Sequence, residues 1–137
     1  MKICGIELKG NDAVIVSLLF DGNAYTFIKK EIKKIKLKDT DEQTDVKEFT
    51  NELYSFFDSV GFNAISIKGR AKKGKFAGGS VSFKIEGIIQ NSKFPVKIFP
   101  GATIKAKLKN TEIDSSQING YQEEALRAAI CYKITQS

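Results

Sequence analysis

Residues 2–28 read KICGIELKGNDAVIVSLLFDGNAYTFI, a stretch in which three apolar runs are separated by two turns. The runs are rich in the β-branched and aromatic residues that favour strands. The turns, KGND and DGN, contain residues that tolerate the backbone angles of tight turns. The stretch therefore predicts an antiparallel meander of three strands, over residues 2–8, 13–20 and 24–28.

A helix is predicted to follow the meander. Apolar residues recur at helical spacing from Val46 to Val60, and Asp45 with Glu48 at the start has the spacing of a capping box. Residues 29–41, before this helix, are rich in lysine. That basic stretch fits either a strand extension or loop with a solvated lysine face, or a rim that contacts phosphates.

Strands and helices alternate in the rest of the chain. Strands are expected over 62–67 and 96–99, helices over 80–89 and 121–134, and residues 103–109 fit either structure. Together with the meander, these elements predict a single α/β domain covering residues 1–137. We expect a five-stranded mixed sheet, the antiparallel three-strand meander plus two parallel strands, with helices on both faces.

The composition is that of a globular domain with a basic balance. The 22 Lys+Arg against 16 Asp+Glu give a net charge of +6, which favours polyanionic partners such as nucleic acid but also fits solvated charged faces. The absence of histidine excludes Ser-His and Cys-His nucleophiles and argues against a zinc site. Cys4 and Cys131 lie in apolar runs and are expected to be buried free thiols. With no signal-peptide pattern and no membrane-spanning apolar stretch, we expect a cytoplasmic protein without membrane contact.

Three segments match the elements of one known family. They are ICGIEL at residues 3–8, FPVKIFP at 94–100 followed by TIK at 103–105, and EEALRAA at 123–129. In order and in local sequence they resemble the first strand, the fifth strand with its lysine-bearing helix, and the last helix of the RuvC and YqgF branch of the ribonuclease H-like superfamily. The resemblance spans nearly the whole chain and implies a ribonuclease H-like fold in a small bacterial member of that branch.

The resemblance also implies a metal-dependent phosphodiesterase site. In this family, carboxylates from the first strand, the fourth strand and the last helix hold divalent ions that activate water. Mg²⁺ or Mn²⁺ suits such hard oxygen ligands. By position, Glu7 takes the first-strand place and Glu124 the last-helix place, with Glu123 as a less well-aligned neighbour.

Two positions depart from the family pattern. Lys68 stands where the fourth strand should carry an acid, and Tyr121 takes the place of the second acid of the last helix. An ammonium group competes electrostatically with a metal ion. The sequence therefore leaves open two interpretations: a reduced catalytic site of Glu7, Glu124 and Lys68, or a salt bridge that fills the former metal site. Asp12 and Asp114 are alternative carboxylates.

A glycine-rich basic loop, residues 68–79, follows the fourth strand. Its spacing does not match a P-loop. It fits either a solvated loop or a contact with a nucleic-acid backbone. The predicted nucleic-acid-binding residues are Arg70, Lys72, Lys73, Lys75, Phe76 and, outside the loop, Lys105.

Three functions follow from these features. The first is a nucleic-acid-associated protein with a degenerate acidic site that does not cut its ligand. The second is a Mg²⁺-dependent nuclease, similar to Holliday-junction resolvases, with a reduced carboxylate set. The third is a non-catalytic protein-interaction module, and the resemblance implies a homodimer because RuvC relatives dimerise.

Overall fold

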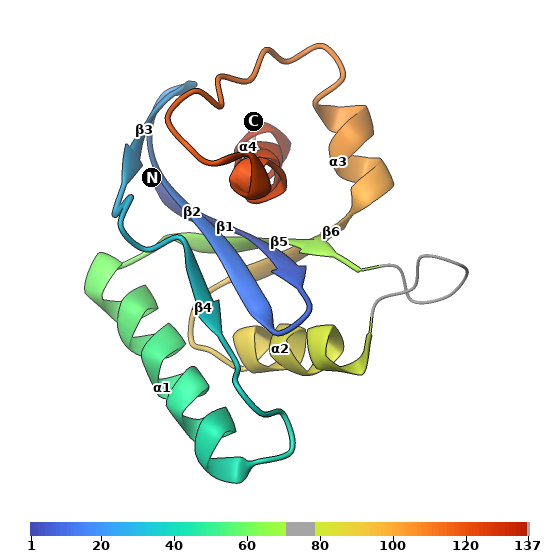
Figure 1. The fold of residues 1–137 in the computed structure, drawn as a ribbon. Helices are drawn as coiled ribbons and strands as arrows, with labels where there is room; N and C mark the ends of the chain where they lie inside the picture. Colours follow the sequence, from blue (N-terminus) through green and yellow to red (C-terminus); the bar gives the residue numbers. More distant parts are fainter. Residues whose placement is uncertain (71–78, 137) are drawn as a thin grey trace.

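The computed structural model describes residues 1–70 and 79–136 (Figure 1). Strand order in the sheet is β3-β2-β1-β5-β6, and β4 pairs with β2 beside β3. The strands are β1 (Lys2–Lys9), β2 (Asp12–Asp21), β3 (Ala24–Ile28), β4 (Lys34–Lys36), β5 (Ala64–Gly69) and β6 (Val96–Pro100). The helices are α1 (Gln43–Val60), α2 (Ser80–Gln90), α3 (Gly101–Lys107), the 3-10 turn η1 (Gly120–Gln122) and α4 (Glu123–Thr135).

The mixed sheet predicted from the sequence is confirmed. Strands β1, β2 and β3 pair antiparallel, and β5 pairs in parallel with both β1 and β6. The sheet has a sixth strand, β4, inside the basic stretch that sequence patterns left open as strand or loop. Ile35 makes this possible because it is 4% exposed and enters the core between two exposed lysines.

Two helix starts differ from expectation. Helix α1 begins at Gln43 after Glu42, which makes no side-chain cap bond, so the predicted capping box of Asp45 and Glu48 is wrong. The ambiguous segment after β6 is helical, as α3. At the last helix, η1 precedes α4, with a capping box between Asn119 and Gln122.

Helices cover both faces of the sheet (Figure 1). Helices α1 and α2 lie on one face, where they pack against alternate residues of β1 and β5 such as Ile6 and Ile67. Helices α3 and α4 lie on the opposite face, where they pack against Ile3 and Val14. The alternation of strand side chains therefore divides the core into two clusters.

Gly5 lets α4 approach β1 closely. A Cβ atom at this position would overlap the carbonyl oxygen of Ala125 and lie 2.9 Å from the Cβ of Ala129. The alanines of α4 supply the matching small surface. The hydroxyl of Ser66 on β5 also donates a hydrogen bond of 2.6 Å to the Ala128 carbonyl. Helix α4 is thus held directly over the β1–β5 pair.

The two cysteines are buried and free, as predicted, and they belong to opposite faces of the sheet. Burial raises the pKa of the Cys4 thiol. It also raises the pKa of Cys131, an effect that the nearby Lys107 ammonium partly offsets. Both thiols are therefore poor nucleophiles in the folded protein. Within the described ranges, no helix is long and apolar enough to cross a membrane.

Gly5→Ala should destabilise the protein by about 2–3 kcal/mol, because the added methyl group meets helix backbone rather than a flexible side chain. The matched control is Gly87→Ala in α2, where a Cβ meets nothing within 4 Å. That control should be neutral or raise stability by up to about 1 kcal/mol through helix propensity. Urea unfolding measures both. Equal effects of the two substitutions would contradict the close approach of α4.

Candidate nucleic-acid interface

Strand register places charged residues in two rows at the carboxyl end of β1. In the first row, Lys68 of β5 is paired with Glu7 of β1, Glu7 with Val14 of β2, and Val14 with Lys34 of β4. Residues paired in this way project from the same face of a sheet. Val14 packs in the cluster that contains α4, so this row lies on the α4 face.

The second row lies two residues further along the strands. Lys9 is paired with Asp12, and Asp12 with Lys36. The side chains of Lys9 and Lys36 are exposed. We call the two rows together the charged rows, defined by Lys68, Glu7, Lys34, Lys9, Asp12 and Lys36.

Glu7 is the buried member of the charged rows. The residue is 5% exposed, and its Oε2 and Oε1 atoms lie 3.7 Å from Lys68 Nζ and 3.5 Å from Lys9 Nζ. Oε1 accepts no hydrogen bond from the described residues. A buried carboxylate needs nearby positive charge. Two lysines provide that charge here.

Lys68 also reaches α4. Its Nζ atom lies 3.2 Å from Oε2 of Glu124 in the first turn of the helix. The Nε atom of Arg127, one turn later, lies 4.0 Å from the same oxygen. The Lys68 ammonium therefore sits between two carboxylates that are far apart in the sequence. This is the position where two converging carboxylates would otherwise share a cation.

Among the described residues, the side chains around Glu7 do not form a ligand set for a divalent metal ion. Both glutamates contact the Lys68 ammonium, and the described part of the chain contains no group of three or more His, Cys, Asp or Glu placed to hold an ion. Ions such as Mg²⁺ and Mn²⁺ need several oxygen ligands, and a neighbouring ammonium opposes their charge. In this structure, the carboxylates of Glu7 and Glu124 both form ion pairs with the Lys68 ammonium.

Other predicted site residues lie around this centre or away from it. Glu123 is exposed beside Glu124, and Lys105 is exposed on α3. Asp12 belongs to the charged rows. Asp114 lies beside Tyr25 of β3, and hydrogen bonds from Ser116 lower the pKa of its carboxyl. Asp114 is therefore not part of the Glu7 cluster.

Arg70 lies at the carboxyl end of β5. Its Nη1 atom donates a hydrogen bond of 3.5 Å to the Leu8 carbonyl, and its Nε atom is buried without a partner in the described residues. The guanidinium thus borders the Glu7 end of β1. Lys72, Lys73, Lys75 and Phe76, also predicted to bind nucleic acid, lie outside the described residues.

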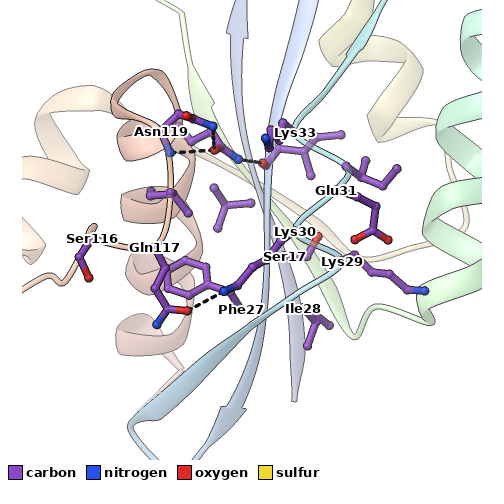
Figure 2. Close-up of a pocket in the computed structure, with 15 residues that line it drawn as sticks. Ser17, Phe27, Ile28, Lys29, Lys30, Glu31, Lys33, Ser116, Gln117 and Asn119 are labelled. Carbon is purple, nitrogen blue, oxygen red and sulfur yellow. Dashed lines mark hydrogen bonds between the residues drawn. The ribbon is translucent and has the colours of Figure 1, made fainter.

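A pocket of about 470 Å³ opens where β3 and β4 separate along β2 (Figure 2). Gln122 closes one side of it, because its side-chain amide donates a hydrogen bond of 2.9 Å to the Ile15 carbonyl. Its Oε1 atom accepts hydrogen bonds of 3.0 and 3.1 Å from the backbone and side chain of Asn119. Gln122 therefore fastens the start of α4 to β2.

Sequence reasoning missed Gln122. It included Lys34 and Lys36 in a basic stretch that fits a phosphate-contacting rim, but it did not place them in the same rows as Glu7. The Asn119–Gln122 spacing is a capping-box signal that could have located the turn. The placement of Lys34 and Lys36 depends on pairing with β2, and no local pattern encodes that register.

The strand order, with helices on both faces of the mixed sheet, gives this chain an α/β fold of the ribonuclease H-like class, the fold of RuvC. The structure of Thermus thermophilus RuvC aligns with it at a TM-score of 0.77 and 10% identity, covering 99% of this chain and 95% of that chain. Thermus thermophilus RuvC in complex with Holliday junction substrate aligns at a TM-score of 0.71 and 11% identity, with the same coverage. At such identities the similarity concerns the fold.

The chain belongs to the family DUF3010, described as a protein of unknown function, which matches residues 1–132. No curated protein matches the chain. The predicted kinship with RuvC therefore holds at the level of fold, and the roles of Glu7, Glu124, Glu123 and Lys68 stay predictions.

Lys68→Met should destabilise the protein by about 1–3 kcal/mol, because it leaves the buried Glu7 carboxylate with one lysine. The control is Lys93→Met, which breaks the exposed pair with Asp58 and should cost less than about 1 kcal/mol. Adding Glu7→Gln to Lys68→Met should restore part of the loss. A double-mutant cycle by chemical denaturation measures the coupling. A coupling of zero would mean that the two side chains do not interact.

Proposed function

We propose that this protein binds nucleic acid on the charged rows without cleaving it. The observation that carries the proposal is the Lys68 ammonium held between Glu7 and Glu124. In a metal-dependent nuclease, this place between carboxylates belongs to a cation that activates water. A lysine can attract a phosphate there but cannot supply that chemistry.

The charge of the surface supports a polyanionic ligand. Lys9, Lys34 and Lys36 are exposed, and Lys68 and Arg127 are partly exposed beside them. These five cations outnumber the four carboxylates of Glu7, Asp12, Glu123 and Glu124. Because Glu7 is buried, the lysines dominate what a ligand would meet. The similarity to a RuvC fold that was solved with a Holliday junction also supports a nucleic-acid ligand.

Other properties belong to the same proposal. A cytoplasmic location would keep the two free thiols reduced. A homodimer, which the resemblance to RuvC implies, stays a prediction. The Mg²⁺-dependent nuclease is the competing function, and the metal experiment below separates it from non-cleaving binding.

Salt dependence locates the binding surface. The affinity for a labelled oligonucleotide should fall as salt rises, and Lys36→Gln should reduce the slope of log K against log salt by roughly 0.7–0.9, the value for one lost phosphate contact. Lys47→Gln, on α1 across the sheet, removes another exposed lysine and should leave the slope unchanged. Fluorescence anisotropy measures both. If only Lys47→Gln changed the slope, the binding surface would lie on the α1 face instead of on the charged rows.

Metal response separates binding from cleavage. The melting temperature of the wild type should not respond to Mn²⁺, and no cleavage of single-stranded or branched DNA should appear with Mg²⁺ or Mn²⁺. Lys68→Asp replaces the ammonium with a third carboxylate, so this variant should gain a Mn²⁺-dependent rise in melting temperature. Lys97→Asp, on β6, makes the same charge change away from Glu7 and should gain none. Metal-dependent cleavage by the wild type would overturn the proposal.

A further inference from the structure

We propose that Tyr121 is a stacking platform for an unpaired base, so that the ligand of the charged rows is single-stranded or locally unpaired nucleic acid. This inference rests on the proposed function and names the form of its ligand. It starts from an exposed aromatic ring next to the charged rows. Tyr121 is 38% exposed, and only Met1 and Leu19 among the described large hydrophobic residues are as open to solvent.

The turn that carries Tyr121 is fixed in place. The next residue, Gln122, is 4% exposed and bonds to the Ile15 carbonyl of β2 and to Asn119. Two residues later, Glu124 contacts Lys68. The ring therefore extends from a backbone that is anchored on both sides. Such a preorganised aromatic loses little conformational entropy when a ligand binds.

A cation already lies against the ring. Lys34 Nζ is 5.5 Å from the ring centroid of Tyr121, within the range of a cation–π contact. The Lys34 side chain is exposed, and in the described residues its ammonium has no ion pair with a carboxylate. When a base stacks on the ring, this flexible ammonium can turn toward the adjoining phosphate. The ring of Tyr121 thus offers a stacking surface for a base, and the Lys34 ammonium offers a charge partner for the adjoining phosphate.

The row spacing fits a continuous strand. Lys34 is three strands away from Lys68, which is about 14 Å at the usual spacing of paired strands. That distance corresponds to roughly four stacked nucleotides at about 3.4 Å each. A strand whose phosphate contacts Lys68 can thus reach Tyr121 with a base about four nucleotides further along. Because bases inside a duplex already stack on both faces, only an unpaired base can use the ring.

The experiment compares single-stranded and duplex DNA. Tyr121→Ala should weaken binding of an oligothymidylate about tenfold, within the range measured for loss of one base–aromatic stack, and should leave duplex binding unchanged within about twofold. Tyr121→Phe keeps the ring and should bind within about twofold of the wild type. Leu19→Ala removes a comparably exposed hydrophobic residue, 39% exposed, and should have no effect on binding.

A spectroscopic readout tests the stack directly. A single-stranded probe containing 2-aminopurine should be quenched on binding to the wild type and to Tyr121→Phe, and should be quenched less by Tyr121→Ala at saturation. Melting curves establish that each variant is folded. If the wild type binds neither DNA form, the proposed function fails. If the wild type binds but Tyr121→Ala binds and quenches as well as Tyr121→Phe, the stacking inference alone is overturned.

Discussion

The close approach of α4 to β1 at Gly5 is the constraint on which the site depends. A side chain at Gly5 would push the helix away at Ala125, immediately after Glu124. The contact with Lys68 at 3.2 Å would then be lost, and Glu7 would keep one lysine. The first strand and the last helix thus meet because one residue has no side chain. The packing of the core and the electrostatics of the site have the same cause.

Lys68 and Glu7 stabilise each other's unusual positions. Burial of the Glu7 carboxylate is unfavourable without a cation, and Lys68 reaches it because their strands are paired in register. Lys68 is held over the sheet in turn because Glu124 attracts it from α4. Glu7 therefore has a structural role here, whether or not a metal site once existed at this position. It is an anion that holds a lysine at the end of the sheet.

Much of the fold followed from the sequence, because local patterns encode it. The strands of the meander and the helices α1, α2 and α4 have clear periodicities. The meeting of β1 and α4 was instead implied by the resemblance of residues 3–8 and 123–129 to the first strand and last helix of the RuvC branch. β4 is different, since its three residues gain strand structure only by pairing with β2. The row from Lys68 to Lys34 crosses four strands. Its order is a property of long-range register, which no window of sequence contains.

The same non-local register also concentrates the excess positive charge of the chain on one part of the sheet. A net charge of +6 spread evenly would give weak, undirected attraction. Here Lys34 and Lys36 flank the buried Ile35, so the core itself fixes the strand from which both lysines project. Pairing with Val14 and Asp12 then places both lysines in the same rows as Glu7 and Lys9, two strands away. An isoleucine that serves packing thereby determines where a polyanion would meet the sheet.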